Sequence, residues 1–122
     1  MLFSQSATCF PQDRKDILKV KSDTVSADSV EYKLIVFDPG FESWLVTQPS
    51  ASFHSKGYYE MKNRLYVNEW NYRYEHELRY GNLYENRIEY YPDVDYGLDL
   101  NYRLYYFFRY FEEQNKIRLI LP

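Results

Sequence analysis

The chain contains few of the residues on which disulfide-bonded, cysteine-metal and nucleotide-binding proteins depend. Its 122 residues include one cysteine, Cys9, and four glycines. A single cysteine rules out a disulfide within the chain and argues against a cysteine-based metal site. With so little glycine, the loops that wrap phosphate groups are excluded, and the chain contains neither a P-loop nor a dinucleotide-binding fingerprint.

Long runs of one kind of residue are also missing. The 15 basic and 18 acidic residues are mixed along the chain, for a net charge of −3. Because no cluster of Lys or Arg forms a positive patch, we expect no nucleic-acid partner. No run of about 18 or more apolar residues occurs, so the sequence predicts no transmembrane segment.

Tyrosine is the residue that the chain has in quantity. It has 15 tyrosines, and aromatic residues make up 20% of the sequence. A buried tyrosine needs a hydrogen-bond partner for its hydroxyl, so a tyrosine-rich core must take polar side chains inside with it. We therefore interpret the polar residues of the stretch NEWNYRYEHELRYG, residues 68–81, as partners of buried rings and not as a catalytic cluster.

Residues 1–31 are expected to be a signal remnant followed by a flexible tether. The segment MLFSQSATCF has small residues before Cys9, as a secretory leader does, but only Leu2 and Phe3 represent its hydrophobic run. Cys9 is then either the lipid-acceptor cysteine of a bacterial lipoprotein, and so a lipid anchor, or a free cysteine. Residues 10–31 are polar and lack a strong period, which is typical of a linker.

Residues 32–122 are predicted to form a single tyrosine-rich domain. Residues 32–37 are apolar and β-branched, and residues 116–122 alternate, so both are predicted strands. Since a lone strand leaves its backbone groups unpaired, we expect these two strands to pair. The predicted fold class is therefore α+β: a mainly helical single domain with a small sheet formed by N- and C-terminal strands.

Three helices are predicted within this domain. Asp38 and Pro39 suit the start of a short helix, as its N-cap and first residue. The longest helix is predicted from Tyr58 to Tyr80, with Gly81 as its stop. The last helix is predicted from Leu98 to Gln114.

The longest predicted helix carries two opposed apolar stripes, at about 100° of rotation per residue. The first consists of Val67, Trp70, Tyr74 and Leu78, and the second of Tyr58, Met61, Leu65 and Tyr72. A helix with two such stripes is expected to be covered on two sides. Glu60, Asn63 and Asn71 lie near the first stripe and form, with Arg64, a candidate polar cluster.

Five tyrosines are candidates for binding a partner. They are Tyr102, Tyr106 and Tyr110, spaced by four on the last predicted helix, and Tyr58 and Tyr72 on the second stripe. Exposed amphipathic rings recognise carbohydrates or proteins with little loss of entropy. The alternatives are that these rings pack against one another within the monomer, or that they mediate self-association.

The segment DVDYGLDLN has oxygen-bearing side chains in alternation, as calcium loops do. Its candidate ligands are Asp93, Asp95 and Asp99. Its glycine comes one place too early for an EF-hand, and Leu104 stands where the bidentate glutamate belongs. These departures favour a turn followed by a helix cap at Asp99, and no cofactor is expected.

Three segments, LIVFDPGFESWL, EWNYR and VDYGLDLNYRLYYFF, resemble recurring segments of a small uncharacterised protein family of Bacteroidota, known only as a domain of unknown function. The likeness covers most of residues 32–120. It implies an extracytoplasmic bacterial protein, periplasmic or associated with the outer membrane, often made with a signal or lipoprotein leader. It supplies no activity, cofactor or catalytic residue.

The sequence thus favours a non-catalytic binding or structural module of the bacterial envelope, with a protein or carbohydrate partner. The alternative is a hydrolase that uses paired carboxylates among Asp38, Glu60, Asp93 and Asp95. If it acted on glycosides, two of these carboxyl groups would have to face one cleft at a separation of about 5 to 9 Å.

Overall fold

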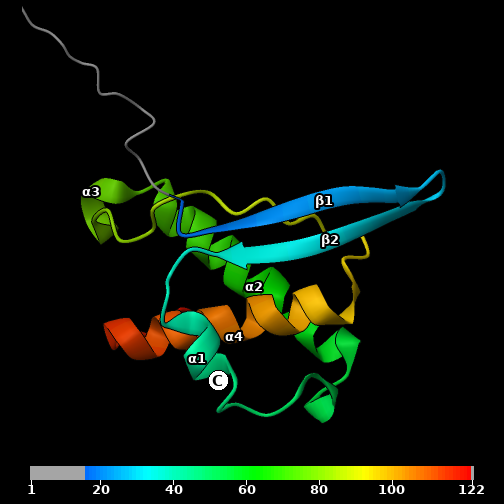
Figure 1. Cartoon of the computed structure of the whole chain (residues 1–122). Coiled ribbons are helices and arrows are strands. Elements are labelled where there is room, and N and C mark those ends of the chain that lie inside the picture. Colours follow the sequence, from blue (N-terminus) through cyan, green and yellow to red (C-terminus); the bar gives the residue numbers. More distant parts are fainter. Residues whose placement is uncertain (1–15, 122) are drawn as a thin grey trace, which may run out of the picture.

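Two long helices and a β-hairpin account for most of the structure, a computed structural model that describes residues 16–121 (Figure 1). The elements are β1 (Leu18–Ser26), β2 (Ser29–Val36), α1 (Phe41–Leu45), α2 (Lys56–Tyr74), α3 (Glu77–Tyr80) and α4 (Gly97–Asn115), with a 3-10 turn at Ala51–Phe53. α2 and β2 both pack on α4, and the tip of the hairpin projects beyond the helices (Figure 1). The fold class is α+β, as predicted.

The sheet is a two-stranded antiparallel hairpin, so the predicted pairing of N- and C-terminal strands is wrong. β1 pairs with β2, with Leu18 opposite Val36 at the base of the hairpin. Leu18 and Leu34 are buried there, whereas residues 21–31 are exposed. Residues 18–31, expected in the tether, form most of the hairpin, and their polar outer half hides the alternation that would have marked a strand.

The segment after α4 is not the predicted strand. Lys116 has a left-handed backbone (φ 54°) and turns the chain back over the end of α4. Leu119 is buried, and its N–H donates to Glu112 Oε2 at 2.7 Å. The carboxylate thereby accepts a backbone hydrogen that a partner strand would otherwise have accepted.

The helix predicted over Tyr58–Tyr80 is broken into α2 and α3. Ser55 caps α2, because its Oγ accepts the Tyr58 N–H at 3.1 Å. At the break, His76 leaves the helical backbone (φ −122°, ψ 56°), and its Nδ1 lies 2.7 Å from the Tyr72 carbonyl. Gly81, with φ 78°, ends α3, as predicted for the whole segment.

The core is built largely from aromatic rings on the inner faces of α2 and α4. Trp70 is fully buried and meets the Phe111 ring edge-on, with centroids 4.7 Å apart. Tyr66 stacks on Phe108 at 4.7 Å. Offset and edge-to-face contacts of this kind add to the free energy of burying each ring. α4 is therefore the central element around which α1, α2 and β2 pack.

Candidate functional site

The tyrosines of the last helix lie inside the monomer. Tyr106 and Tyr110 are only 6% and 7% exposed, and both pack on Trp44 of α1, with centroids 6.4 and 5.2 Å apart. The Tyr110 hydroxyl donates to Asp38 Oδ1 at 3.0 Å, and the half-buried Tyr102 donates to the Pro49 carbonyl at 2.9 Å. The ridge expected to be exposed is thus covered by α1 and the loop after it.

The two candidate tyrosines on α2 differ from this group. Tyr58 is half-buried and stacks on His54 at 4.0 Å. Tyr72 remains 42% exposed and stacks on His76 at 4.2 Å. Of the five tyrosines proposed from the sequence, Tyr72 has the most accessible ring for a partner.

The second apolar stripe of α2 is open to solvent, which corrects the expectation that α2 is covered on two sides. We call this surface the outer face of α2 and define it by Tyr58, Met61, Leu65, Asn68 and Tyr72. Met61 is 45% exposed and Leu65 49% exposed, while Asn68 lies exposed between Leu65 and Tyr72. The spacing of these five residues is 3-4-3-4, the repeat of a coiled-coil seam. Sequence reasoning noted the stripe but missed this repeat.

Charges along this outer face are divided between its two halves. Lys62 and Arg64 flank the N-terminal half, and neither forms an ion pair with another residue of the described range 16–121. Lys62 Nζ lies 5.8 Å from the centre of the Tyr58 ring. In the C-terminal half, Glu69 pairs with Arg73 at 2.7 Å. With Glu60 four residues before Arg64, the N-terminal half has two positive charges and one negative charge, and so a net positive charge.

One member of the candidate polar cluster, Asn63, forms a buried amide pair with Asn101. Asn63 is fully buried, and its Nδ2 donates to Asn101 O at 2.9 Å and to Asn101 Oδ1 at 3.1 Å. The same Oδ1 accepts the Tyr90 hydroxyl at 2.6 Å. Burial raises the pKa of Tyr90 to about 12, the Glu60 carboxylate adds to this rise, and Arg64 opposes it. The two amides and the Tyr90 hydroxyl thus hydrogen-bond to one another, whereas Arg64 is exposed. Asn63 Oδ1 is buried without a partner in residues 16–121.

The fourth member, Asn71, serves the backbone. Its Nδ2 donates to Ile88 O at 3.0 Å and its Oδ1 accepts Ile88 N–H at 2.8 Å, so one amide satisfies both backbone groups of a loop residue. Beside it, Trp70 Nε1 donates to Asn86 O at 2.8 Å, and Asn86 Nδ2 donates to Leu18 O at 3.2 Å. Asn86, which sequence reasoning missed, thus joins the loop to the base of β1.

Two of the carboxylates proposed for hydrolysis, Asp38 and Asp95, are held by hydrogen bonds to different partners. Asp38 Oδ1 accepts from Gly40 N at 2.8 Å and from Tyr110. Gly40, not Asp38, is the N-cap of α1, so that expectation is wrong. Asp95 pairs with Lys56 at 3.0 Å, which lowers the pKa of its carboxyl. Asp38 and Asp95 are thus held by partners on different parts of the fold, while Glu60 is half-buried and Asp93 is exposed.

Two of the three candidate calcium ligands, Asp95 and Asp99, have local roles in the turn and first helical turn of α4. Asp93 is exposed, and Asp95 Oδ1 accepts the Gly97 N–H at 3.0 Å in the turn before α4. Asp99 is exposed in the first turn of α4, where its negative charge interacts favourably with the helix dipole. The N-cap of α4 is Tyr96, so the predicted cap at Asp99 is wrong. Within residues 16–121, no group of three or more His, Cys, Asp or Glu side chains is arranged to hold a metal ion.

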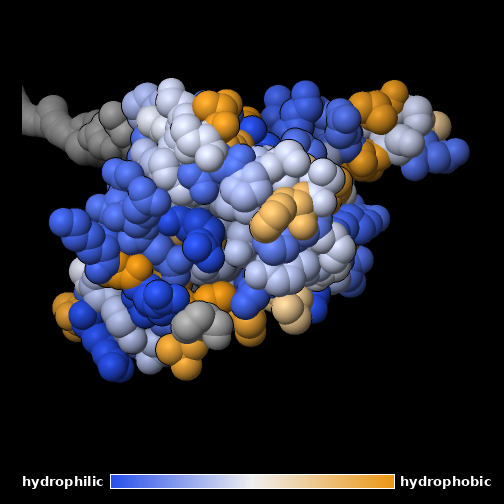
Figure 2. All heavy atoms as spheres, turned by 90° about the horizontal axis from the view of Figure 1, so that it is seen from below, coloured by the Kyte–Doolittle hydropathy of each residue, from blue (hydrophilic) through white to orange (hydrophobic). Residues whose placement is uncertain are grey.

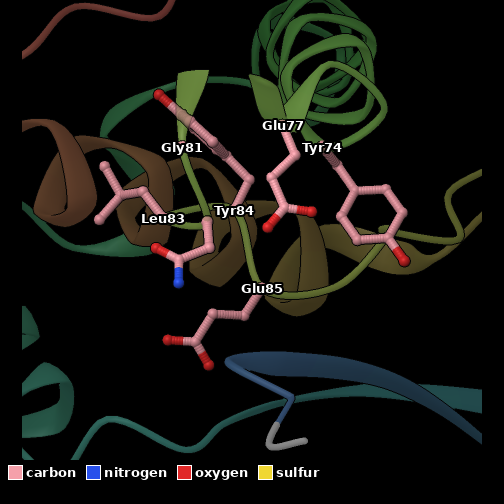
Figure 3. Close-up of a pocket in the computed structure, with 7 residues that line it drawn as sticks. Tyr74, Glu77, Gly81, Leu83, Tyr84 and Glu85 are labelled. Carbon is pink, nitrogen blue, oxygen red and sulfur yellow. The ribbon is translucent and has the colours of Figure 1, made fainter. Parts of the chain in front are cut away.

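A shallow polar pocket of about 570 Å³ opens where α3 meets the loop that follows it. Its lining residues are Tyr74, Glu77, Gly81, Asn82, Leu83, Tyr84 and Glu85. Figure 3 shows that Glu77 comes from α3 and Glu85 from the loop. The Tyr84 hydroxyl accepts from Arg73 Nη1 at 2.9 Å, so a side chain of α2 fixes this buried ring as well. None of the proposed site residues lines this pocket.

The chain has an α+β architecture in which polar side chains satisfy an aromatic core and one helix face is left open. Residues 2–121 match the family model described as a family of unknown function, DUF6146. The chain therefore belongs to that family. No curated protein and no solved structure shows significant similarity to it.

Proposed function

We propose that the chain is a non-catalytic binding module whose contact surface is the outer face of α2. The observation that carries the proposal is the exposure of Met61 and Leu65, at 45% and 49%, between the aromatic ends of a 3-4-3-4 repeat. Exposed apolar side chains scattered singly need no explanation, whereas apolar side chains that follow one another along one helix face, here with Asn68 among them, are typical of an interaction site. The proposed hydrolase receives no comparable support, because two of its four acids, Asp38 and Asp95, are held by separate partners.

The occupant that this surface fits is an amphipathic helix of a partner protein. A 3-4 repeat matches the knobs-into-holes packing of one helix on another. From Tyr58 to Tyr72 the seam is about 21 Å long, at about 1.5 Å per residue, which suits a helix better than a sugar ring. Lys62 and Arg64 form no ion pair in the described part of the chain and leave a net positive charge beside the face, so the facing positions of the partner helix are expected to be acidic.

The location of the module is part of the same proposal. We infer an extracytoplasmic module of the envelope in Bacteroidota, in the periplasm or at the outer membrane, supported by the resemblance of its segments. Within residues 16–121, no helix combines the length and apolar character needed to span a bilayer. The proposed lipid anchor, Cys9, lies outside the described residues.

A designed helical peptide tests the proposal directly. The peptide carries leucines at 3-4 spacing and glutamates at the flanking positions, and its controls are a scrambled peptide and a lysine version. We expect the acidic peptide to bind best, and Leu65→Asp to weaken binding at least about tenfold, or about 1.4 kcal/mol. The matched control is Leu98→Asp, at a residue 40% exposed at the start of α4.

Equal binding of the acidic, lysine and scrambled peptides would contradict the proposed docking of an acidic helix. So would equal effects of Leu65→Asp and Leu98→Asp. A charge reversal at Lys62 and Arg64 together should reverse the preference from the acidic to the lysine peptide, since these two cations select the partner.

A further inference from the structure

The hairpin forms an arm with an open edge along β1. Figure 2 shows the arm extending from the body, with hydrophilic residues nearest the body and hydrophobic residues among hydrophilic ones toward its tip. The Ile17 carbonyl accepts from Phe37 N at 2.9 Å, so the backbone groups of odd-numbered residues in β1 face β2. Those of even-numbered residues face outward, as the bond from Asn86 to the Leu18 carbonyl shows. Beyond that bond, the outward edge runs through Val20, Ser22 and Thr24.

The charges on the arm are arranged unfavourably for a monomer. Lys21 lies opposite Lys33, and Asp23 lies opposite Glu31. Like charges directly opposite each other destabilise a strand pair. All four side chains are exposed, and none forms an ion pair with another residue of the part that the structure describes. The arm therefore has a positive rung and a negative rung, side by side.

We propose that two copies of this chain pair antiparallel through their β1 edges, about a twofold axis at Ser22. In this register Lys21 faces Asp23 of the second copy, and the twofold axis repeats the pair. Val20 faces Thr24 of the second copy, so outward-facing backbone groups meet outward-facing backbone groups. The same surface is used on both copies, as a closed twofold dimer requires. The two hairpins then form one four-stranded sheet.

The charge pattern selects this register among its neighbours. A twofold axis at Lys21 would put Lys21 against its own copy, and an axis at Asp23 would put Asp23 against its own copy. Only the axis at Ser22 joins both rungs with opposite charges. Lys21 still faces Lys33 within each copy, but each row across the dimer then runs Lys33, Lys21, and Asp23 and Glu31 of the second copy, so opposite charges meet at its centre.

The β1 edge is a better candidate than the β2 edge. β2 packs on α4, and its Tyr32 meets the Tyr96 ring edge-on at 4.8 Å. By contrast, every residue of β1 from Lys21 to Ser26 is exposed. Free strand edges pair readily with another chain, and here the pairing has a specific register. The inference does not depend on the proposed function, because the outer face of α2 takes no part in it.

Sedimentation equilibrium over a concentration series tests the dimer. We expect Lys21→Asp to raise the dimer dissociation constant about tenfold or more, because the twofold axis applies the change twice. The double variant Lys21→Asp/Asp23→Lys should restore dimerisation, since the opposite charges face each other again. Lys19→Asp, on the same strand, is the matched control and should change the constant much less.

Cross-linking tests the register. In a Cys9→Ser background, Ser22→Cys should form a disulfide dimer under mild oxidation, because Cα atoms about 5.5 Å apart suit a disulfide. Ser26→Cys, which lies four residues from the axis and beyond the irregularity in register that follows Thr24, should not. A monomer at every concentration, equal cross-linking of both variants, or failure of the charge swap to restore the dimer would overturn the proposal. Dissociation of the dimer by Leu65→Asp would assign dimerisation to α2 and would equally overturn it.

Discussion

Replacement of Asn71 by alanine should destabilise the fold far more than replacement of Asn68, three residues earlier on the same helix. The Asn71 amide gives Ile88 both of its backbone partners, at 3.0 and 2.8 Å, and Ile88 is 2% exposed. Truncation leaves two buried backbone groups unsatisfied, at about 1–3 kcal/mol each. We therefore expect Asn71→Ala to lower the free energy of unfolding by about 2–4 kcal/mol. Asn68 is exposed, so its replacement should change this free energy by less than about 0.5 kcal/mol.

Urea denaturation of both variants and the wild type, followed by circular dichroism, measures these differences. A third variant, Asn71→Asp, keeps the acceptor for the Ile88 N–H but sets a carboxylate against the Ile88 carbonyl, so it should also be less stable than the wild type. The reasoning is refuted if Asn71→Ala and Asn68→Ala unfold within about 0.5 kcal/mol of each other, because the amide would then contribute nothing that an exposed amide does not.

Two further predictions concern alkaline pH and close packing. Burial raises the pKa of Tyr90 and of Tyr105 to about 12, while both titrate near pH 10 in the unfolded chain. The unfolded chain then releases these protons first, so the free energy of unfolding should fall as pH rises from about 10 to about 12. Denaturation and tyrosinate absorbance, measured together, check this. A fall that starts only above about pH 12 would contradict it. A Cβ added at Gly40 would lie 2.8 Å from the Tyr110 hydroxyl, so Gly40→Ala should destabilise by about 1–3 kcal/mol in urea denaturation. Gly57→Ala is the control, because only the Ser55 hydroxyl, at 3.9 Å, lies near its Cβ; an equal loss in both variants would contradict the steric argument.

The elements that were predicted best are those with a strong and continuous pattern. The last helix was expected from Leu98 to Gln114 and runs from Gly97 to Asn115, because one side of it is aliphatic and aromatic throughout. Gly81 was correctly predicted to end the preceding helical segment. The break at His76 could not be read from periodicity, since it depends on the ring approaching the Tyr72 carbonyl.

The hairpin and the C-terminal segment show where a short apolar pattern misleads. Only the base of β1 is buried, at Leu18, and the polar residues beyond it resemble a linker. Residues 116–121 alternate like a strand, yet Glu112 at the end of α4 accepts two of their backbone N–H groups, those of Ile117 and Leu119. Neither outcome is decided by the apolar pattern alone, because each depends on which groups satisfy the backbone.

The candidate site was predictable in part. The candidate polar residues Asn63 and Asn71 lie where interior partners were expected, but their hydrogen-bond acceptors and donors, Asn101 and Ile88, are far away in the sequence. The burial of Tyr106 depends on Trp44 of α1, which periodicity along α4 cannot reveal. The 3-4 repeat of the outer face of α2, by contrast, is present in the sequence and could have been recognised there.

The account rests on polar side chains that satisfy buried hydroxyl groups, and a double-mutant cycle at Tyr90 and Asn101 tests this most directly. The Tyr90 hydroxyl donates to Asn101 Oδ1 at 2.6 Å, and Asn101 is fully buried. We predict that Asn101→Ala costs about 1–2 kcal/mol less in a Tyr90→Phe background than in the wild type, because no hydroxyl is then left unpaired. Equal costs in the two backgrounds, within about 0.3 kcal/mol, would contradict the account.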